Sequence, residues 1–368
     1  GRNRDGAAEG QARHPRSKTT RTTVSYEYEK VATPASGLRL HLNENTAGCS
    51  PAVVEALQRM TVHDLAVYPD YDEAIAACAA RLRVAPDWLL LTNGLDEGIL
   101  AAAVVAHRGP SGAAPFEAIV VVPAFDMYGA CSDAAGGRVI EVPLGTGFAF
   151  PIDAVLAAIT ERTRIVWLTN PNNPTGQLIP AEAIVRIAER APAALIFVDE
   201  AYGDFSGATL IGGELLKRLP NVIVGRTFAK AYGLAGLRVG AVIAQPQTIA
   251  SLRRVVPPYS INACAAAVLP AAFADAAFYD WYLSQVSQSK ALLYEAFEAG
   301  GIEHWKSAAN FVLARFDGES ARIAAALATR GIHVRDRSRD SGCSGCLRIT
   351  AGVVDHTRRF LSALQEVR

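Results

Sequence analysis

The sequence has few cysteines, no excess of either charge and no long apolar run, and each shortage excludes a class of protein. Its six cysteines are scattered over 368 residues, far from the density of a disulfide-stabilised scaffold. Lysine plus arginine and aspartate plus glutamate both total 36, so no overall field would attract nucleic acid or an anionic membrane. The longest apolar stretches are of strand length, short of the roughly 20 residues that span a bilayer. We expect a protein in a reducing, cytoplasmic setting, without nucleic-acid or membrane partners.

Several chemical motifs are missing as well. Cys343 and Cys346 form one C-x-x-C, but no second pair or nearby histidine pair completes the four ligands of a zinc site, so no metal is expected. The chain has no G-x-x-x-x-G-K-[ST] loop, which excludes a nucleotide hydrolase built on the carboxylates Asp199 and Glu200. The glycines after Lys230 do not fit G-x-G-x-x-G, which excludes dinucleotide binding.

The residues that are present predict a folded, two-domain protein. Hydrophobic residues make up 50% and charged residues 20%, values typical of a globular chain, and the length exceeds that of one small core. Residues 1–30 begin with an arginine-rich stretch that has little to bury, and we expect a disordered tail there. We expect residues 31–60 to join a small domain, 61–260 to form a large domain and 261–368 to form the rest of the small one.

Short β-branched runs alternate with stretches of helical periodicity from residue 72 onward. The runs are residues 89–92, 118–122, 139–142, 165–169, 195–198, 222–224 and 239–244. The helical stretches are 72–83, 96–107, 125–135, 180–190 and 246–255. Continuous apolar runs are typical of strands buried on both faces, so we predict an α/β fold with a mostly parallel, seven-stranded sheet. The smaller α+β domain should contain helices at 263–280, 282–299 and 319–330, and strands at 311–316, 332–335 and 347–350.

Polar residues follow four of these runs, at 93–97, 170–176, 199–202 and 226–230. Ligands of parallel sheets bind beyond the carboxyl ends of the strands, so we expect these four segments to meet at one site. Gly94 frees a turn before a helix that begins near Leu95, and a helix N-terminus with spare N–H groups is suited to an anion.

The same segments carry a family resemblance. N-P-N-N-P-T-G at 170–176, V-D-E-A-Y at 198–202 and R-T-F-A-K-A-Y-G-L-A-G-L-R at 226–238 resemble, in order and spacing, the fold-type I aminotransferases that depend on pyridoxal 5'-phosphate. Within that group the chain most resembles histidinol-phosphate aminotransferases. Four motifs carry this closer resemblance: L-N-E-N at 42–45, V-Y-P-D at 67–70, N-G-L-D-E at 93–97 and A-N-F-V-L-A-R-F at 309–316. It extends from about residue 38 to the end.

The resemblance implies a role for each residue that would hold the ring of the cofactor. Lys230 would bind the cofactor covalently and move the proton at the substrate Cα. Asp199 would pair with the ring nitrogen and keep it protonated. Asn173 and Tyr202 would hydrogen-bond the phenolic oxygen, and Phe125 would stack on the ring.

The resemblance also implies residues for the cofactor phosphate. The amides of Gly94, Leu95 and Asp96 would bind it at the helix N-terminus. The Thr227 hydroxyl and the Arg238 guanidinium would complete this site.

Two further sets of residues are implied for the partner subunit and the substrate. Tyr68 would reach the phosphate from a second subunit, which predicts a homodimer with shared active sites. Arg348 would bind the α-carboxylate of an amino acid or 2-oxo acid, with Asn173 beside it. Arg335 would bind a substrate phosphate, and Tyr259 would assist.

The resemblance leaves alternatives open. Residues 43–48 read N-E-N-T-A-G where many members have N-E-N-P-Y-G, so the substrate side differs, and Tyr26 or Tyr28 are candidates for a missing aromatic. The leading function is transamination of histidinol phosphate with 2-oxoglutarate. An aromatic amino-acid aminotransferase and a decarboxylase of a phosphorylated amino acid such as threonine phosphate are alternatives. A cofactor-sensing transcription regulator would need a helix-turn-helix, which the residues before the motifs do not contain.

Overall fold

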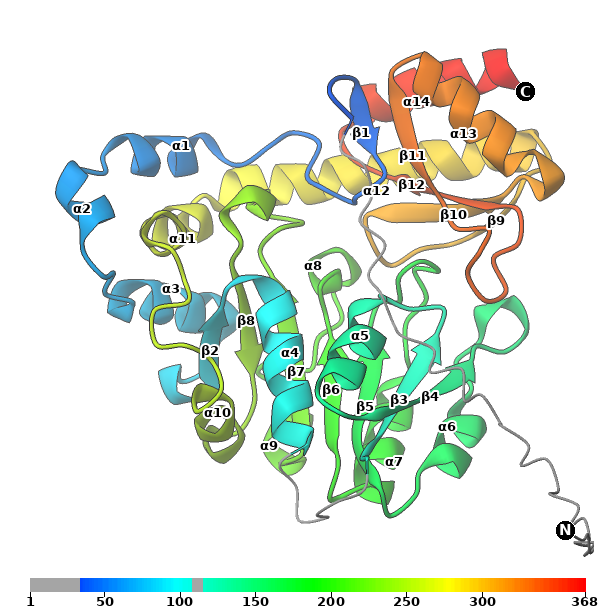
Figure 1. Ribbon diagram of the computed structural model, residues 1–368. Helices are drawn as coiled ribbons and strands as arrows, with labels where there is room; N and C mark the ends of the chain where they lie inside the picture. Colours follow the sequence, from blue (N-terminus) through cyan, green and yellow to red (C-terminus); the bar gives the residue numbers. More distant parts are fainter. Residues whose placement is uncertain (1–33, 108–114) are drawn as a thin grey trace, which may run out of the picture.

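The computed structural model describes residues 34–107 and 115–368, which form two sheets with helices around them (Figure 1). The predicted tail at 1–30 and the candidates Tyr26 and Tyr28 lie outside these residues. The larger sheet has seven strands in the order β2-β8-β7-β6-β5-β3-β4, and the smaller has five in the order β1-β11-β12-β10-β9.

The seven-stranded sheet confirms the predicted α/β fold. Its strands are β2 (Leu89–Thr92), β3 (Glu117–Val122), β4 (Arg138–Pro143), β5 (Thr163–Thr169), β6 (Leu195–Asp199), β7 (Val222–Thr227) and β8 (Gly240–Ile243). The pairs among β4, β3, β5, β6 and β7 are parallel, whereas β8 runs antiparallel to both of its neighbours. Because Thr169 pairs with Asp199, and Asp199 with Gly225, the carboxyl ends of β5, β6 and β7 lie side by side.

Apolar side chains bury both faces of this sheet, as the continuous runs predict. Alternate residues of β5 go to opposite sides, so Val166 and Leu168 pack in one core and Ile165 and Trp167 in the other. The helices around it are α1 (Pro51–Gln58), α2 (Val62–Ala66), α3 (Asp72–Leu82), α4 (Gly94–His107), α5 (Met127–Ala134), α6 (Ile152–Ala158), α7 (Ala181–Arg190), α8 (Gly203–Ser206), α9 (Glu214–Arg218), α10 (Pro246–Arg253) and α11 (Ala263–Ala274). Short 3₁₀ turns occupy Pro86–Trp88, Thr146–Phe148, Ala235–Leu237 and Asp317–Glu319.

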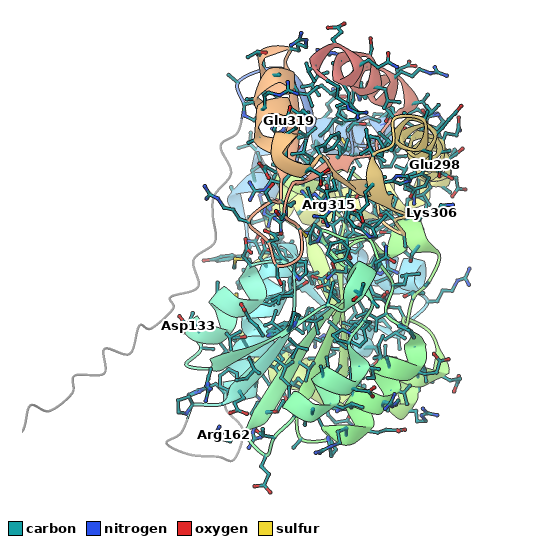
Figure 2. All side chains as sticks on the ribbon, turned by 90° about the vertical axis from the view of Figure 1, so that its right-hand side faces the viewer. Asp133, Arg162, Glu298, Lys306, Arg315 and Glu319 are labelled. Atoms are coloured by element: carbon teal, nitrogen blue, oxygen red, sulfur yellow. The ribbon has the colours of Figure 1, made fainter. Side chains whose placement is uncertain are left out.

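The five-stranded sheet buries only one face under helices. Its strands are β1 (Leu38–Leu40), β9 (Glu303–Trp305), β10 (Phe311–Arg315), β11 (Ile332–Asp336) and β12 (Cys346–Thr350). The covering helices are α12 (Ala276–Ala299), α13 (Ser320–Thr329) and α14 (Val354–Val367). Charged side chains such as Glu298, Lys306 and Glu319 lie on the outside (Figure 2). Because Leu347 and Ile349 pack against the helices, Arg348 between them points to the other face, toward the seven-stranded sheet.

The region around α11 differs from the prediction in two ways. The expected helix at 263–280 ends at Ala274, because the Asp275 carboxylate accepts the Phe278 N–H at 3.1 Å and begins α12. In addition, α11 packs in the core of the seven-stranded sheet through Ala265 and Leu269, not with the smaller sheet. No single helix of the described residues is long and apolar enough to cross a membrane; the α11–α12 pair, bent by 79°, meets that test by length and composition only.

Candidate active site

A cavity of about 420 Å³ lies where the carboxyl ends of β5, β6 and β7 face the smaller sheet. It brings together most of the predicted site residues: Leu95, Asp96, Phe125, Asn173, Asp199, Tyr202, Thr227, Lys230, Arg238, Arg335 and Arg348. Further lining residues were missed by the sequence analysis, among them His41, Tyr128 and Arg337. The large sheet supplies one wall and the small sheet supplies the arginines of the other.

Lys230 is the one lysine of the described residues that lines this cavity. The turn after β7 holds it, with the Ala229 N–H donating to Thr227 Oγ1 at 3.2 Å. Its Nζ donates to the Leu42 carbonyl at 2.9 Å and lies 6.0 Å from the centre of the Tyr202 ring. The amine is thus held inside the cavity by one neutral acceptor and a π face, and no carboxylate of the described residues is bonded to it.

Asp199 is a buried carboxylate at the end of β6. The Tyr128 hydroxyl donates to its Oδ2 at 2.6 Å, and the Ala201 N–H donates to its Oδ1 at 2.8 Å. Burial raises the pKa of Asp199 to about 6, although both hydrogen bonds lower it. A cationic group placed beside this carboxylate would offset the cost of its burial. Tyr128 lies in the first turn of α5, three residues after Phe125, and no motif in the sequence marks it as a site residue.

Arg348 is nearly fully buried, yet its two hydrogen-bond partners among the described residues are neutral oxygens. Its Nη1 donates to Asn173 Oδ1 at 2.5 Å and its Nη2 to the His41 carbonyl at 2.6 Å. Burial, together with Arg337 and Arg335 nearby, lowers the pKa of Arg348 to about 9. At pH 7 the guanidinium therefore remains charged, and an anion in the cavity would offset that buried charge.

The N-terminus of α4 is the predicted site of the cofactor phosphate. The Gly94 amide donates to the Arg238 carbonyl at 3.0 Å, so that amide already has a partner within the chain, and its role toward the phosphate stays a prediction. Gly94 also has φ +68°, and a Cβ there would lie 2.5 Å from Arg238 Nη2. Arg238 Nη2 binds Asp96 Oδ2 at 2.8 Å. The first-turn amides of Leu95 and Asp96, the Thr227 hydroxyl and the Arg238 guanidinium remain at the cavity.

Phe125 and Tyr202 are flat side chains in the cavity wall. The Phe125 ring meets Tyr128 edge-on, with centroids 5.9 Å apart at 87°. The Tyr202 hydroxyl accepts a hydrogen bond from Asn43 Nδ2 at 3.0 Å, and its ring meets Phe311 edge-on at 5.0 Å. Both rings are therefore oriented by contacts made within this chain.

Tyr68 and Tyr259 are not among the residues that line the cavity of their own chain. Their rings stack on each other, with centroids 4.4 Å apart, and they are 77% and 55% exposed. Exposed apolar residues continue this surface at Val62, Leu65 and Val67. The stacked pair therefore belongs to an outer apolar surface.

Cys343 and Cys346 are buried free thiols packed with Phe148 and Leu313. In residues 34–107 and 115–368, no group of three or more His, Cys, Asp or Glu side chains is arranged to hold a metal ion. The C-x-x-C of the sequence thus forms part of an apolar cluster near β12.

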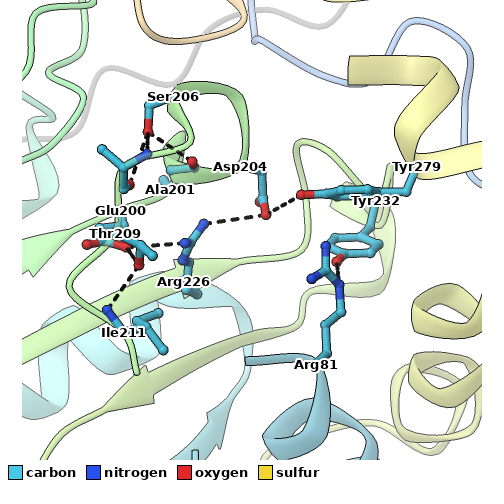
Figure 3. A network of polar contacts seen from close by, with 12 residues as sticks. Arg81, Glu200, Ala201, Asp204, Ser206, Thr209, Ile211, Arg226, Tyr232 and Tyr279 are labelled. Atoms are coloured by element: carbon cyan, nitrogen blue, oxygen red, sulfur yellow. Dashed lines mark hydrogen bonds and ion pairs between the residues drawn. The ribbon is translucent and has the colours of Figure 1, made fainter. Parts of the chain in front are cut away.

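A buried ionic cluster is formed by residues next in sequence to the cavity residues Asp199 and Thr227 (Figure 3). Arg226 lies between two carboxylates, with Nη2 3.2 Å from Glu200 Oε2 and Nη1 3.4 Å from Asp204 Oδ1. Glu200 also accepts hydrogen bonds from Thr209 Oγ1 at 2.6 Å and from the Leu210 N–H at 2.8 Å. Burial raises the pKa of Glu200 above its ordinary value although Arg226 lowers it.

Aromatic hydroxyls extend the cluster to α3 and α12. The Tyr279 hydroxyl donates to Asp204 at 2.8 Å, and Arg81 Nε donates to the Tyr232 hydroxyl at 2.6 Å. The Arg81 guanidinium lies 4.7 Å from the centre of the Tyr279 ring, and the two tyrosines stack at 4.9 Å. The turn that carries Lys230 is thereby tied to helices far away in the sequence.

Removing one partner of this cluster should destabilise the protein. Glu200→Gln leaves Arg226 buried with less compensation, and we expect the free energy of unfolding to fall by about 3 kcal/mol. Glu189→Gln is the matched control, because Glu189 pairs with Arg218 at 3.8 Å in a pair with both side chains about 60% exposed. The control should cost less than about 1 kcal/mol. Denaturant unfolding of both variants measures the difference; equal losses would show that burial of the cluster is not the cause.

Comparison with known proteins places the chain in a family. Residues 35–364 match the family model of aminotransferase class I and II. Histidinol-phosphate aminotransferase 1 of Cupriavidus pinatubonensis is 36% identical over 337 residues, which cover 89% of this chain and 87% of that protein. The histidinol-phosphate aminotransferase of Moorella thermoacetica is 35% identical, with 90% and 85% covered. The crystal structure of histidinol-phosphate aminotransferase from Sinorhizobium meliloti in complex with pyridoxal-5'-phosphate is 26% identical, covers 95% of this chain and 98% of its own, and has a TM-score of 0.81. The chain therefore belongs to the aminotransferase class I and II family.

Proposed function

We propose that this protein transfers the amino group of histidinol phosphate to 2-oxoglutarate with pyridoxal 5'-phosphate as cofactor. The observation that carries the proposal is the joint presence, in one cavity, of Lys230, the buried acid Asp199 and the arginines Arg335 and Arg348. The relatives with 35–36% identity over about nine tenths of the chain are histidinol-phosphate aminotransferases, which supports this donor.

The cavity residues fit pyridoxal phosphate. Asp199 has the burial and raised pKa of a carboxylate that would be stabilised by a protonated ring nitrogen. The first-turn amides of Leu95 and Asp96, with Thr227 and Arg238, would hold the phosphate. Phe125 would stack on the ring, and Asn173 and Tyr202 would hydrogen-bond its phenolic oxygen. When bound, the cofactor supplies an electron sink for the bond broken at the substrate Cα.

The chain itself supplies the proton transfer and the orientation of the substrate. The Lys230 amine would bind the cofactor at rest and then take the proton from the substrate Cα. Tyr128 would hold Asp199 in place through its 2.6 Å hydrogen bond. Arg348 would fix the α-carboxylate of 2-oxoglutarate with two parallel hydrogen bonds.

Arg335 distinguishes the candidate substrates. It faces the cavity beside Arg348, its partner in the β11–β12 register, and a guanidinium there would bind the phosphate of the donor. An aromatic amino acid carries no phosphate for this guanidinium to bind, and this difference favours a phosphorylated donor. A decarboxylase of a phosphorylated amino acid such as threonine phosphate would use the same arginine, and the aminotransferase relatives favour transamination instead.

We also propose a homodimer with shared active sites. Tyr68 and Tyr259 lie outside their own cavity and next to exposed apolar residues of α2, a surface that a second copy would cover. In that arrangement the Tyr68 hydroxyl would reach the cofactor phosphate of the other subunit, and Tyr259 would lie beside its substrate.

The covalent attachment site is the first test. Borohydride reduction of the purified holoenzyme followed by peptide mapping should place the cofactor on Lys230, since no other lysine of the described residues lines the cavity. Lys230→Ala should abolish the label, while Lys217→Ala, at an exposed lysine, should keep it. Label on another residue, or a purified protein that binds no cofactor, would overturn the proposal.

Shared active sites can be tested with mixed dimers. Tyr68→Phe removes the hydroxyl, and Lys230→Ala removes the amine. If Tyr68 acts across the interface, a mixed dimer has one site with both defects and one intact site, so activity at limiting cofactor should exceed the sum of the parents. Labelled subunits confirm exchange; full exchange without recovered activity would show that each site uses its own Tyr68.

Arg348 and Arg335 should affect different half-reactions. Arg348→Lys loses the planar pair of donors, so kcat/KM for 2-oxoglutarate should fall about ten- to a hundredfold. Histidinol phosphate has no α-carboxylate, so its half-reaction should be slowed by Arg335→Ala and not by Arg348→Lys. Arg358→Ala, 67% exposed, is the control. Single-turnover spectra measure each half-reaction. If Arg335→Ala leaves phosphorylated donors unaffected and phenylalanine or tyrosine is the better donor, the aromatic aminotransferase assignment replaces ours.

A further inference from the structure

His41 is a buried side chain in the cavity wall whose polar atoms are unused. It follows β1 directly, is 3% exposed and lines the cavity. Within residues 34–107 and 115–368, neither ring nitrogen has a hydrogen-bond partner, and the ring meets His333 edge-on with centroids 6.1 Å apart. Buried polar atoms of this kind are normally paired, so a partner is expected among the molecules that enter the cavity.

The sheet places His41 in a row with two arginines. Leu40 pairs with Val334 and Arg335 pairs with Arg348, so the order β1-β11-β12 places His41, directly after β1, near Arg335 on β11 and Arg348 on β12. Leu40 packs against the covering helices, and alternation turns its successor to the cavity face. The His41 carbonyl also accepts the hydrogen bond from Arg348 Nη2.

The charges around His41 determine what its ring can bind. Burial first, and then Arg39, His333, Arg348 and Arg335, lower the pKa of His41 to about 4. The imidazole is therefore neutral at pH 7 and has one N–H to donate. A group bound among these guanidiniums is an anion, to which the ring would donate. A phosphate has three oxygens, and Arg335 can bind two of them, which leaves an acceptor for a further donor.

We propose that His41 is a specificity-determining residue that donates a ring N–H to the phosphate of the amino donor, beside Arg335. This inference rests on the proposed function, because it takes a phosphorylated donor as given. His41 lies outside the residues that bind the cofactor and outside the hydroxyl and carboxylate groups that orient them. Its effect is confined to the end of the donor that carries the anion.

The test compares two donors that differ only in the phosphate. Histidinol phosphate and histidinol are titrated by calorimetry into the pyridoxamine form of the holoenzyme, in which neither reacts. His41→Phe keeps a flat ring but has no N–H donor. The affinity for histidinol phosphate should fall about tenfold, while the affinity for histidinol should change by less than about twofold. His41→Asn and His41→Gln each keep an N–H near one ring-nitrogen position, and one of them should restore most of the lost affinity.

One control variant accompanies the test, and its outcomes distinguish a failure of the His41 role from a failure of the proposed donor. His333→Phe changes the neighbouring ring, whose Nε2 lies 3.0 Å from the Ser36 carbonyl, and should leave both affinities unchanged. If His41→Phe weakens both donors equally, or neither, His41 does not bind the phosphate and the inference fails alone. If the wild type binds histidinol phosphate no better than histidinol, the proposed donor itself is wrong.

Discussion

The position of the active site depends on one buried guanidinium. Arg226 occupies the carboxyl end of β7, and its neighbours Glu200 and Asp204 follow the end of β6. Each partner is adjacent or close in sequence to a cavity residue: Arg226 precedes Thr227, and Glu200 follows Asp199. Because a buried charge tolerates no loss of its partners, the cluster fixes the relative position of two strand ends. The positions of the neighbouring cavity residues Asp199 and Thr227 are fixed with them.

Much of this arrangement could be predicted from the sequence, because the relevant information is local. Continuous apolar runs identified all seven strands of the large sheet, and the polar residues after them include Asn173, Asp199 and Lys230. These side chains are placed by the strand that precedes them. Parallel strands with aligned carboxyl ends bring them together without further information.

The residues that were missed depend on tertiary contacts. Tyr128 carries no motif of its own and gains its role from a hydrogen bond to Asp199, 71 positions away. The Gly94 amide is used by the Arg238 carbonyl, a pairing that no local pattern reveals. The end of α11 is set by the Asp275 cap, whereas apolar residues continue on both sides of it. β1 and β9 have three residues each, too few for an alternation of apolar and polar residues to be recognised in the sequence.

The two walls of the cavity divide the chemistry between them. The acid Asp199 and the amine of Lys230 come from the large sheet, whereas Arg335, Arg348 and His41 come from the small one. Burial of the Arg348 charge is costly and lowers the pKa of that guanidinium, and an anionic substrate would offset this cost by binding. Under the proposed function, substrate selection would depend on residues 38–41 and 332–350, and bond breaking on residues 94–238. A change in the first set would then alter the donor while the residues proposed to hold the cofactor stay the same, because no strand is shared between the two walls.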